Sequence, residues 1–130
     1  ELFLKHQSVH PGIKDVRMVS VRDTWENVTK KLSTCSSIAS SSLHGLVIAD
    51  HLGIPNQWFQ FPGGKAESTE GFFKYQDYFS SVNRFNASPL GNVSGLKDAS
   101  NYWSPPEPSV LRLRIDAIKT SFPYGLFDCL

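Results

Sequence analysis

The sequence predicts an α/β domain, in which a parallel sheet carries helices on its faces and an irregular C-terminal extension follows. Short β-branched or aromatic runs alternate with helical periodicities over residues 16–61. The length of 130 residues fits one domain, and the 40% of hydrophobic residues is enough for a real core. The chain is too short to hold a complete two-domain enzyme.

Residues 16–21 predict the first strand because they are rich in β-branched side chains. Residues 23–34 predict a helix, which either Asp23 or Thr24 can cap. Its apolar residues recur at spacings of three and four, so they form a stripe toward the sheet. These residues are Trp25, Val28 and Leu32.

The second strand is predicted at residues 37–40, and the next helix spans residues 43–52 and is closed by Gly53. The aromatic segment 57–61 predicts a third, buried strand, with Trp58 in the core. Connections this short between like strands are typical of right-handed βαβ units. The three strands are therefore expected to be parallel.

The remaining sequence divides into three parts. Residues 69–82 predict an aromatic amphipathic helix, which completes a domain core over residues 1–82. Residues 83–108 are rich in Pro, Asn and Ser and predict an irregular segment. Residues 109–122 predict a last helix, so the C-terminal part, residues 109–130, is expected to pack on the same domain.

Charge and composition exclude several classes of function. Thirteen basic and twelve acidic residues leave a formal charge of +1, which argues against nucleic-acid binding and a polybasic membrane anchor. No apolar stretch approaches the roughly 18–20 residues that span a bilayer, and no signal peptide is recognisable. Cys35 and Cys129 are too few for a disulfide scaffold, and we expect them to be reduced, with a single bridge between them as the alternative. We expect a cytoplasmic protein, located in solution or at the inner face of the membrane.

The segment 40–46 carries the clearest chemistry, because it joins the end of a predicted parallel strand to the start of a helix. Ligands of open α/β sheets bind at that edge, and the N–H groups of a helix start attract anions. Ser41 and Ser42 can cap the helix and donate hydroxyls, Gly45 allows close approach of the backbone, and His44 can donate a hydrogen bond or a proton. The alternative is that the serines only cap the helix and His44 is an ordinary partly buried side chain.

Other kinds of site find less support. No nucleophile elbow, phosphate-binding P-loop or dinucleotide fingerprint occurs. His44 and His51 are seven residues apart, about 10 Å along a helix, which is too far for one metal ion. No metal site is predicted.

Two segments resemble the polysaccharide pyruvyl transferases. Residues 40–55 match a Ser-Ser-x-His-Gly-Leu segment that leads through a small-residue helix to Gly-Ile-Pro, and residues 71–79 match a Lys-Phe/Tyr-x-Asp-Tyr segment. With the helix and strand over residues 22–39, the resemblance covers about residues 16–82. It implies a Rossmann-like half of a two-domain GT-B-like fold, namely the carboxyl-terminal, donor-binding part. The acceptor-binding amino-terminal domain of such an enzyme would be a partner outside this chain.

The resemblance also implies a reaction and a site. Members transfer the pyruvyl group of phosphoenolpyruvate to a saccharide acceptor of a cell-surface polysaccharide or its precursor, as a ketal, and need no cofactor. His44 is the implied catalytic residue. The implied donor-binding residues are Ser41, Ser42, Gly45, Lys65 and Lys74, and the supporting residues are Arg22 and Asp77.

Two other functions stay open at this point. A nucleotide-sugar glycosyltransferase of GT-B type would use the same helix start for a diphosphate. A non-catalytic fragment or interaction module would keep the motif without its partner domain. For the single positions, Lys74 and Asp77 also fit a solvated i, i+3 pair, and Lys65 also fits a plain surface turn.

Overall fold

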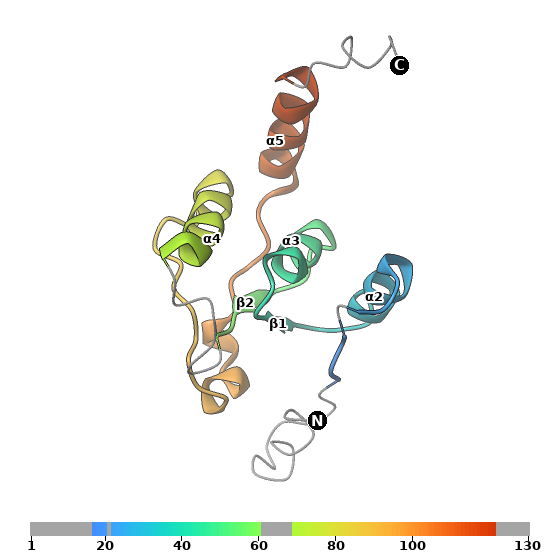
Figure 1. Cartoon of the computed structure of the whole chain (residues 1–130), viewed down its shortest axis with the longest axis vertical. Coiled ribbons are helices and arrows are strands. Elements are labelled where there is room, and N and C mark those ends of the chain that lie inside the picture. The colour runs from blue at the N-terminus through green and yellow to red at the C-terminus, as the bar shows by residue number, and fades with distance from the viewer. Residues whose placement is uncertain (1–16, 21, 61–68, 122–130) are drawn as a thin grey trace.

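The computed structural model describes residues 17–20, 22–60 and 69–121. In chain order the elements are α2 (Trp25–Leu32), β1 (Ile38–Ser40), α3 (Leu43–His51), β2 (Asn56–Trp58), α4 (Thr69–Ser81), the 3-10 turns η2 (Ser94–Lys97) and η3 (Ala99–Asn101), and α5 (Pro108–Ser121). Helix α3 lies at the centre, with α2 on one side and α4 on the other (Figure 1). One buried apolar cluster joins α3 to α2 and β1, and another joins it to β2 and α4.

The sheet is smaller than the sequence predicts. Within the described residues it has two strands, which pair in parallel from Ile38 beside Asn56 to Ser40 beside Trp58. Residues 17–20 belong to the predicted first strand but are not in a strand, and the ends of that segment lie outside the described residues. Two strands are too few for a Rossmann-like half of a GT-B-like fold, so the predicted fold class is wrong. A β-branched run becomes a strand only where another strand pairs with its backbone.

The βαβ unit formed by β1, α3 and β2 is confirmed. The two strands are parallel, and α3 connects them. Gly53 follows the helix with a φ of 68°, a left-handed conformation that suits glycine and turns the chain toward β2. Trp58 on β2 is completely buried, as expected. Phe61, the last residue of the predicted third strand, lies outside the described residues.

Helix α2 begins as predicted but buries a narrower face. Thr24 is the cap, since its side chain accepts a hydrogen bond from the Asn27 N–H. Leu32 is buried and Val28 is half-buried, whereas Trp25 is 69% exposed. The expectation that Trp25 faces the sheet is wrong, because the two-stranded sheet does not extend far enough to cover the first turn of α2.

The irregular segment 83–108 completes the hydrogen bonding of β2. Asn56 and Trp103 exchange two backbone hydrogen bonds of 3.1 and 2.8 Å, and the Leu90 N–H donates to the Trp58 carbonyl at 2.8 Å. The side of β2 that faces away from β1 is therefore paired by this segment. No local pattern predicts such pairing, because the partners are more than 30 residues apart in the sequence.

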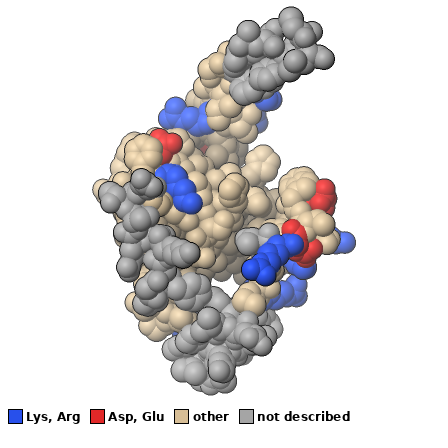
Figure 2. All heavy atoms as spheres, viewed as in Figure 1, with Lys and Arg blue, Asp and Glu red and all other residues tan. Residues whose placement is uncertain are grey.

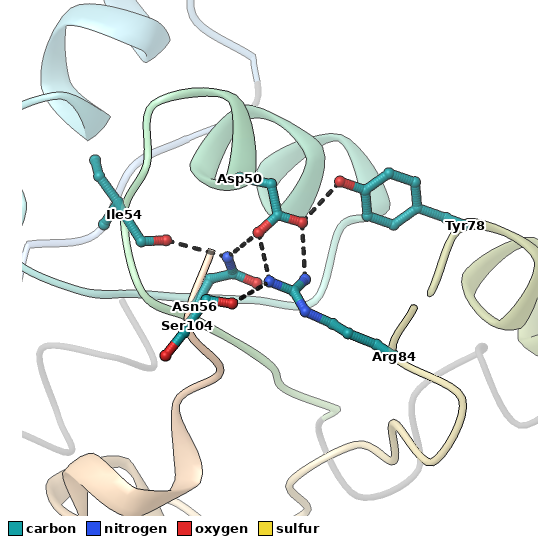
Figure 3. Close-up of polar contacts among 6 residues, drawn as sticks. All are labelled: Asp50, Ile54, Asn56, Tyr78, Arg84 and Ser104. Carbon is teal, nitrogen blue, oxygen red and sulfur yellow. Dashed lines mark hydrogen bonds and ion pairs between the residues drawn. The ribbon is translucent and has the colours of Figure 1, made fainter. Parts of the chain in front are cut away.

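A buried carboxylate ties this segment to α3 and α4. Asp50 lies on α3 with no exposed side-chain surface, and Arg84 donates to both of its oxygens at 2.7 Å (Figure 3). The Tyr78 hydroxyl donates at 2.7 Å and Asn56 Nδ2 at 2.6 Å, while Arg84 also donates to the Ser104 carbonyl. We call Asp50, Asn56, Tyr78 and Arg84 the Asp50 cluster. Since a buried charge is tolerated only when it is paired and hydrogen-bonded, this cluster fixes the segments that supply its donors.

The aromatic helix predicted over residues 69–82 is confirmed as α4. Its buried side chains Tyr75 and Phe79 pack on Trp58 and Leu46. The Tyr75 and Trp58 rings stack with their centroids 4.4 Å apart and their planes 11° apart. Such aromatic contacts add to the stabilisation that comes from buried area, so α4 is held firmly against β2 and α3.

The last predicted helix is present as α5, but it extends away from the other elements (Figure 1). None of its residues is buried, and Leu113 and Ile118 are 68% and 66% exposed. Arg114 Nε donates to the Ser81 carbonyl at 2.8 Å and so connects α5 to the end of α4. That residues 109–130 pack on the same domain stays a prediction, and residues 122–130 lie outside the described residues. In the described part of the chain, no helix combines the length and the apolar character needed to cross a membrane.

Replacing Arg84 with Met should destabilise the fold by about 3–5 kcal/mol, because Asp50 would stay buried without a cation. Lys31→Met is a matched control, since the Lys31–Asp23 ion pair is exposed and its loss should change the melting temperature little. Thermal and urea unfolding, followed by tryptophan fluorescence, measure both variants. Small and equal effects would show that the Asp50 cluster does not hold the fold together.

The chain should lose stability as the pH rises above about 10, the usual pKa of tyrosine. Burial and the hydrogen bond to Asp50 raise the pKa of the Tyr78 hydroxyl well above its usual value, and burial also raises the pKa of Tyr75 and Tyr102. The folded state then keeps protons that the unfolded state releases, so alkali favours unfolding. Comparing the free energy of unfolding at about pH 8 and about pH 11 tests this, and Tyr78→Phe should reduce the difference. An equal difference in both proteins would contradict the role of Tyr78.

Candidate functional site

Ser40 shapes the loop between β1 and α3. Its Oγ accepts a hydrogen bond from the Ser42 N–H at 3.1 Å and donates one to the Ser42 carbonyl at 2.9 Å. Serine hydroxyls close local turns in this way. The loop therefore enters α3 in a fixed direction, and the exposed residue Ser41 lies at its tip.

Gly45 allows α3 to lie directly against this loop. A Cβ at position 45 would overlap Ser40 Oγ and would lie 3.0 Å from Ser40 Cβ. The absence of a side chain at Gly45 therefore allows the helix backbone to approach Ser40 of the same chain. A larger residue would force the loop and the helix apart.

Tyr75 connects the same loop to α4. Its ring is buried against Trp58, and its hydroxyl donates a hydrogen bond of 2.8 Å to the Ser41 carbonyl. Burial raises the pKa of the Tyr75 hydroxyl, and a hydrogen bond with the Leu43 backbone opposes that rise. The hydroxyl therefore keeps its proton and stays a donor at neutral pH.

The start of α3 presents groups that suit an anion. His44 is exposed on the first turn, and Ser42 is the half-buried N-cap residue. The side chain of Ser42 makes no capping hydrogen bond, so the predicted side-chain cap is not formed. The first N–H groups of a helix have no partners within it and carry partial positive charge. Hydroxyl, imidazole and N–H donors thus lie together at this point.

Lys74 and Asp77 are exposed on α4. Lys74 Nζ lies over the Tyr75 ring, 5.4 Å from its centroid. Because the Tyr75 hydroxyl also donates to the Ser41 carbonyl, the Tyr75 side chain contacts both Lys74 and the loop. Asp77 is placed on the helix as expected, and among the described residues no hydrogen bond or ion pair joins it to the loop.

Another predicted basic residue, Arg22, does not join this group in the described part of the chain. Arg22 is exposed before α2, where its backbone N–H donates to Ser20 Oγ at 3.2 Å. Within the described ranges, no hydrogen bond or ion pair joins the Arg22 side chain to the loop before α3, and α2 lies on the opposite side of α3 from α4 (Figure 1). Lys65 lies outside the described residues.

The described side chains at the loop between β1 and α3 are hydrogen-bonding groups, namely serine hydroxyls and the His44 imidazole. Across residues 17–20, 22–60 and 69–121, no three His, Cys, Asp or Glu side chains are grouped so that they could hold a metal ion. Cys35 is a free thiol, and Cys129 lies outside the described residues. The side chains at the loop that could bind a ligand are the Ser41 and Ser42 hydroxyls and the His44 imidazole, whereas Ser40 Oγ and the Ser42 N–H are already hydrogen-bonded within the loop.

Sequence reasoning missed three residues that shape the site, namely Ser40, Tyr75 and Asp50. Asp50 carried a usable signal, because it follows Leu46 by one helical turn on the buried side of α3, and a carboxylate there requires a cation. Tyr75 carried no such signal. Its hydrogen bond to Ser41 crosses 34 positions of the chain, so only the packing of α4 reveals it.

Gly45→Ala should lower the free energy of unfolding by about 1–3 kcal/mol, because the added methyl group overlaps Ser40. Gly91→Ala is the control, since a Cβ there meets nothing within 4 Å. Thermal unfolding of the two variants measures the difference. If both variants unfold like the wild-type chain, α3 does not need this close contact.

Comparison with known proteins gives one partial match. Over 58 residues, 45% of this chain, the sequence is 40% identical to the uncharacterized protein L143 of Acanthamoeba polyphaga mimivirus. The match covers 20% of the viral protein, so the chain spans only about a fifth of that relative's length. No protein-family model matches the chain, and no solved structure matches it. Since the viral protein is uncharacterized, this likeness assigns no function.

Proposed function

We propose that this chain supplies the donor-binding part of a polysaccharide pyruvyl transferase. Such an enzyme moves the pyruvyl group of phosphoenolpyruvate onto a sugar of a cell-surface polysaccharide or its precursor. The basis is the resemblance of residues 40–55 and 71–79 to that family. The observation that supports it best is the exposed His44 on the first turn of α3, beside helix N–H groups and a Ser42 hydroxyl that does not cap the helix.

The donor is a small dianion or trianion, and the chain offers local rather than broad positive charge. On the face shown in Figure 2, Lys and Arg lie in separate groups, and the group on the right of the view is accompanied by Asp and Glu. Recognition would therefore rely on the start of α3, with Lys74 as the nearby cation on α4. Ser41 and Ser42 would donate hydroxyls to the phosphate or the carboxylate.

The chemistry requires a group that can carry a proton. Forming the ketal makes two C–O bonds at C2 of phosphoenolpyruvate and breaks the bond between C2 and the phosphate oxygen. One sugar hydroxyl proton ends on the methylene carbon, which becomes a methyl group, and the other leaves with phosphate. No electrons are gained or lost overall, so the reaction needs no redox cofactor. An imidazole can carry such a proton near neutral pH, and we assign this role to His44.

His44→Ala should weaken binding of phosphoenolpyruvate by about 10-fold to 100-fold, because a charge-assisted hydrogen bond is lost. His51→Ala is the matched control, since His51 is also exposed on α3 but lies on its last turn. Calorimetric titration of the folded chain measures both. In the complete enzyme, which includes the acceptor-binding domain, His44→Ala should also abolish the release of phosphate in the presence of a saccharide acceptor.

Other outcomes would point to other functions. Equal affinity in the wild-type and His44→Ala chains would contradict the role of His44. Tighter binding of a nucleotide sugar than of phosphoenolpyruvate would favour a glycosyltransferase. A folded wild-type chain that binds neither ligand would favour a non-catalytic interaction module.

A further inference from the structure

We infer that Tyr75 is a positioning residue of the donor site. Its hydroxyl holds the loop between β1 and α3 at Ser41, and its ring holds Lys74. This inference rests on the proposed function, since the ligand is the same anion. Under this inference Tyr75 does not contact the substrate itself. It acts through the loop at Ser41 and through Lys74, which would contact the substrate.

Three contacts of one side chain carry the inference. The Tyr75 hydroxyl donates to the Ser41 carbonyl at 2.8 Å. Lys74 Nζ lies 5.4 Å from the ring centroid, and the ring itself stacks on the buried Trp58 at 4.4 Å. The loop before α3 and the Lys74 ammonium group on α4 therefore both contact the Tyr75 side chain, whose ring is held in place by stacking on Trp58.

Comparison with a second tyrosine on α4 distinguishes positioning of the loop from simple attachment of α4 to α3. Tyr78 also lies on α4, but its hydroxyl donates to Asp50 near the other end of α3. The two hydroxyls hold α4 to opposite ends of the same helix. Only Tyr75 bonds to the loop that would receive the anion.

The test compares Tyr75→Phe with Tyr78→Phe in the full chain. Both variants lose one hydroxyl and keep the ring, so both should melt at a lower temperature than the wild-type chain. Tyr75→Phe should in addition weaken binding of phosphoenolpyruvate by about 5-fold to 10-fold, whereas Tyr78→Phe should leave it unchanged. In NMR spectra, the phosphoenolpyruvate-induced shifts of the His44 and Gly45 amide signals should shrink in Tyr75→Phe only.

A second variant, Lys74→Met, keeps the inference testable if the Tyr75→Phe chain does not fold, because Lys74 is exposed. It should also weaken binding, and its effect should add to that of Tyr75→Phe, because phenylalanine keeps the ring that Lys74 contacts and lacks only the hydroxyl that binds the loop. Wild-type affinity in folded Tyr75→Phe would overturn the inference and leave the proposed function intact. Wild-type affinity in Lys74→Met would overturn the inference and would also remove Lys74 from the proposed donor site. A wild-type chain that does not bind phosphoenolpyruvate would overturn the proposed function, and the inference with it.

Discussion

The pairing of the buried Asp50 carboxylate is the constraint on which the rest of this structure depends. A carboxylate without exposed surface is tolerated only when donors replace the water it has lost, and Arg84, Tyr78 and Asn56 supply four hydrogen bonds. These donors come from β2, from α4 and from the segment after α4. The helix that carries Asp50 therefore brings together parts of the chain that a two-stranded sheet would not hold by itself.

Helix α3 is consequently fixed at both of its ends. The Asp50 cluster holds its last turn, while Ser40 and Tyr75 hold the loop that enters its first turn. A short helix fixed in this way gives His44 a defined position even though its side chain is exposed. This links the stability of the fold to the proposed donor site, because the aromatic packing of α4 supports both ends of α3. The likeness to a viral protein of unknown role neither adds to that proposal nor weakens it.

Local signals in the sequence predicted most of the elements correctly. The cap at Thr24, the left-handed Gly53 and the aromatic periodicity of α4 each act over a few residues, so their effects can be read without the rest of the chain. Pairing of residues 17–20 could not be read in this way, because a strand needs a partner that the residues themselves do not specify. The exposure of Trp25 follows from the same error about the extent of the sheet.

By itself, the sequence determined where α2, α3, α4 and α5 lie along the chain, that one βαβ unit joins β1 to β2, and that His44 stands on the first turn of a helix. Those properties depend on spacing, caps and turn residues that interact within a few positions. Only the tertiary structure decided that segment 83–108 pairs with β2, that Arg84 neutralises Asp50 and that Tyr75 binds the loop before α3. The physical reason is distance along the chain, since residues 34 positions apart meet only after the buried side chains between them have packed.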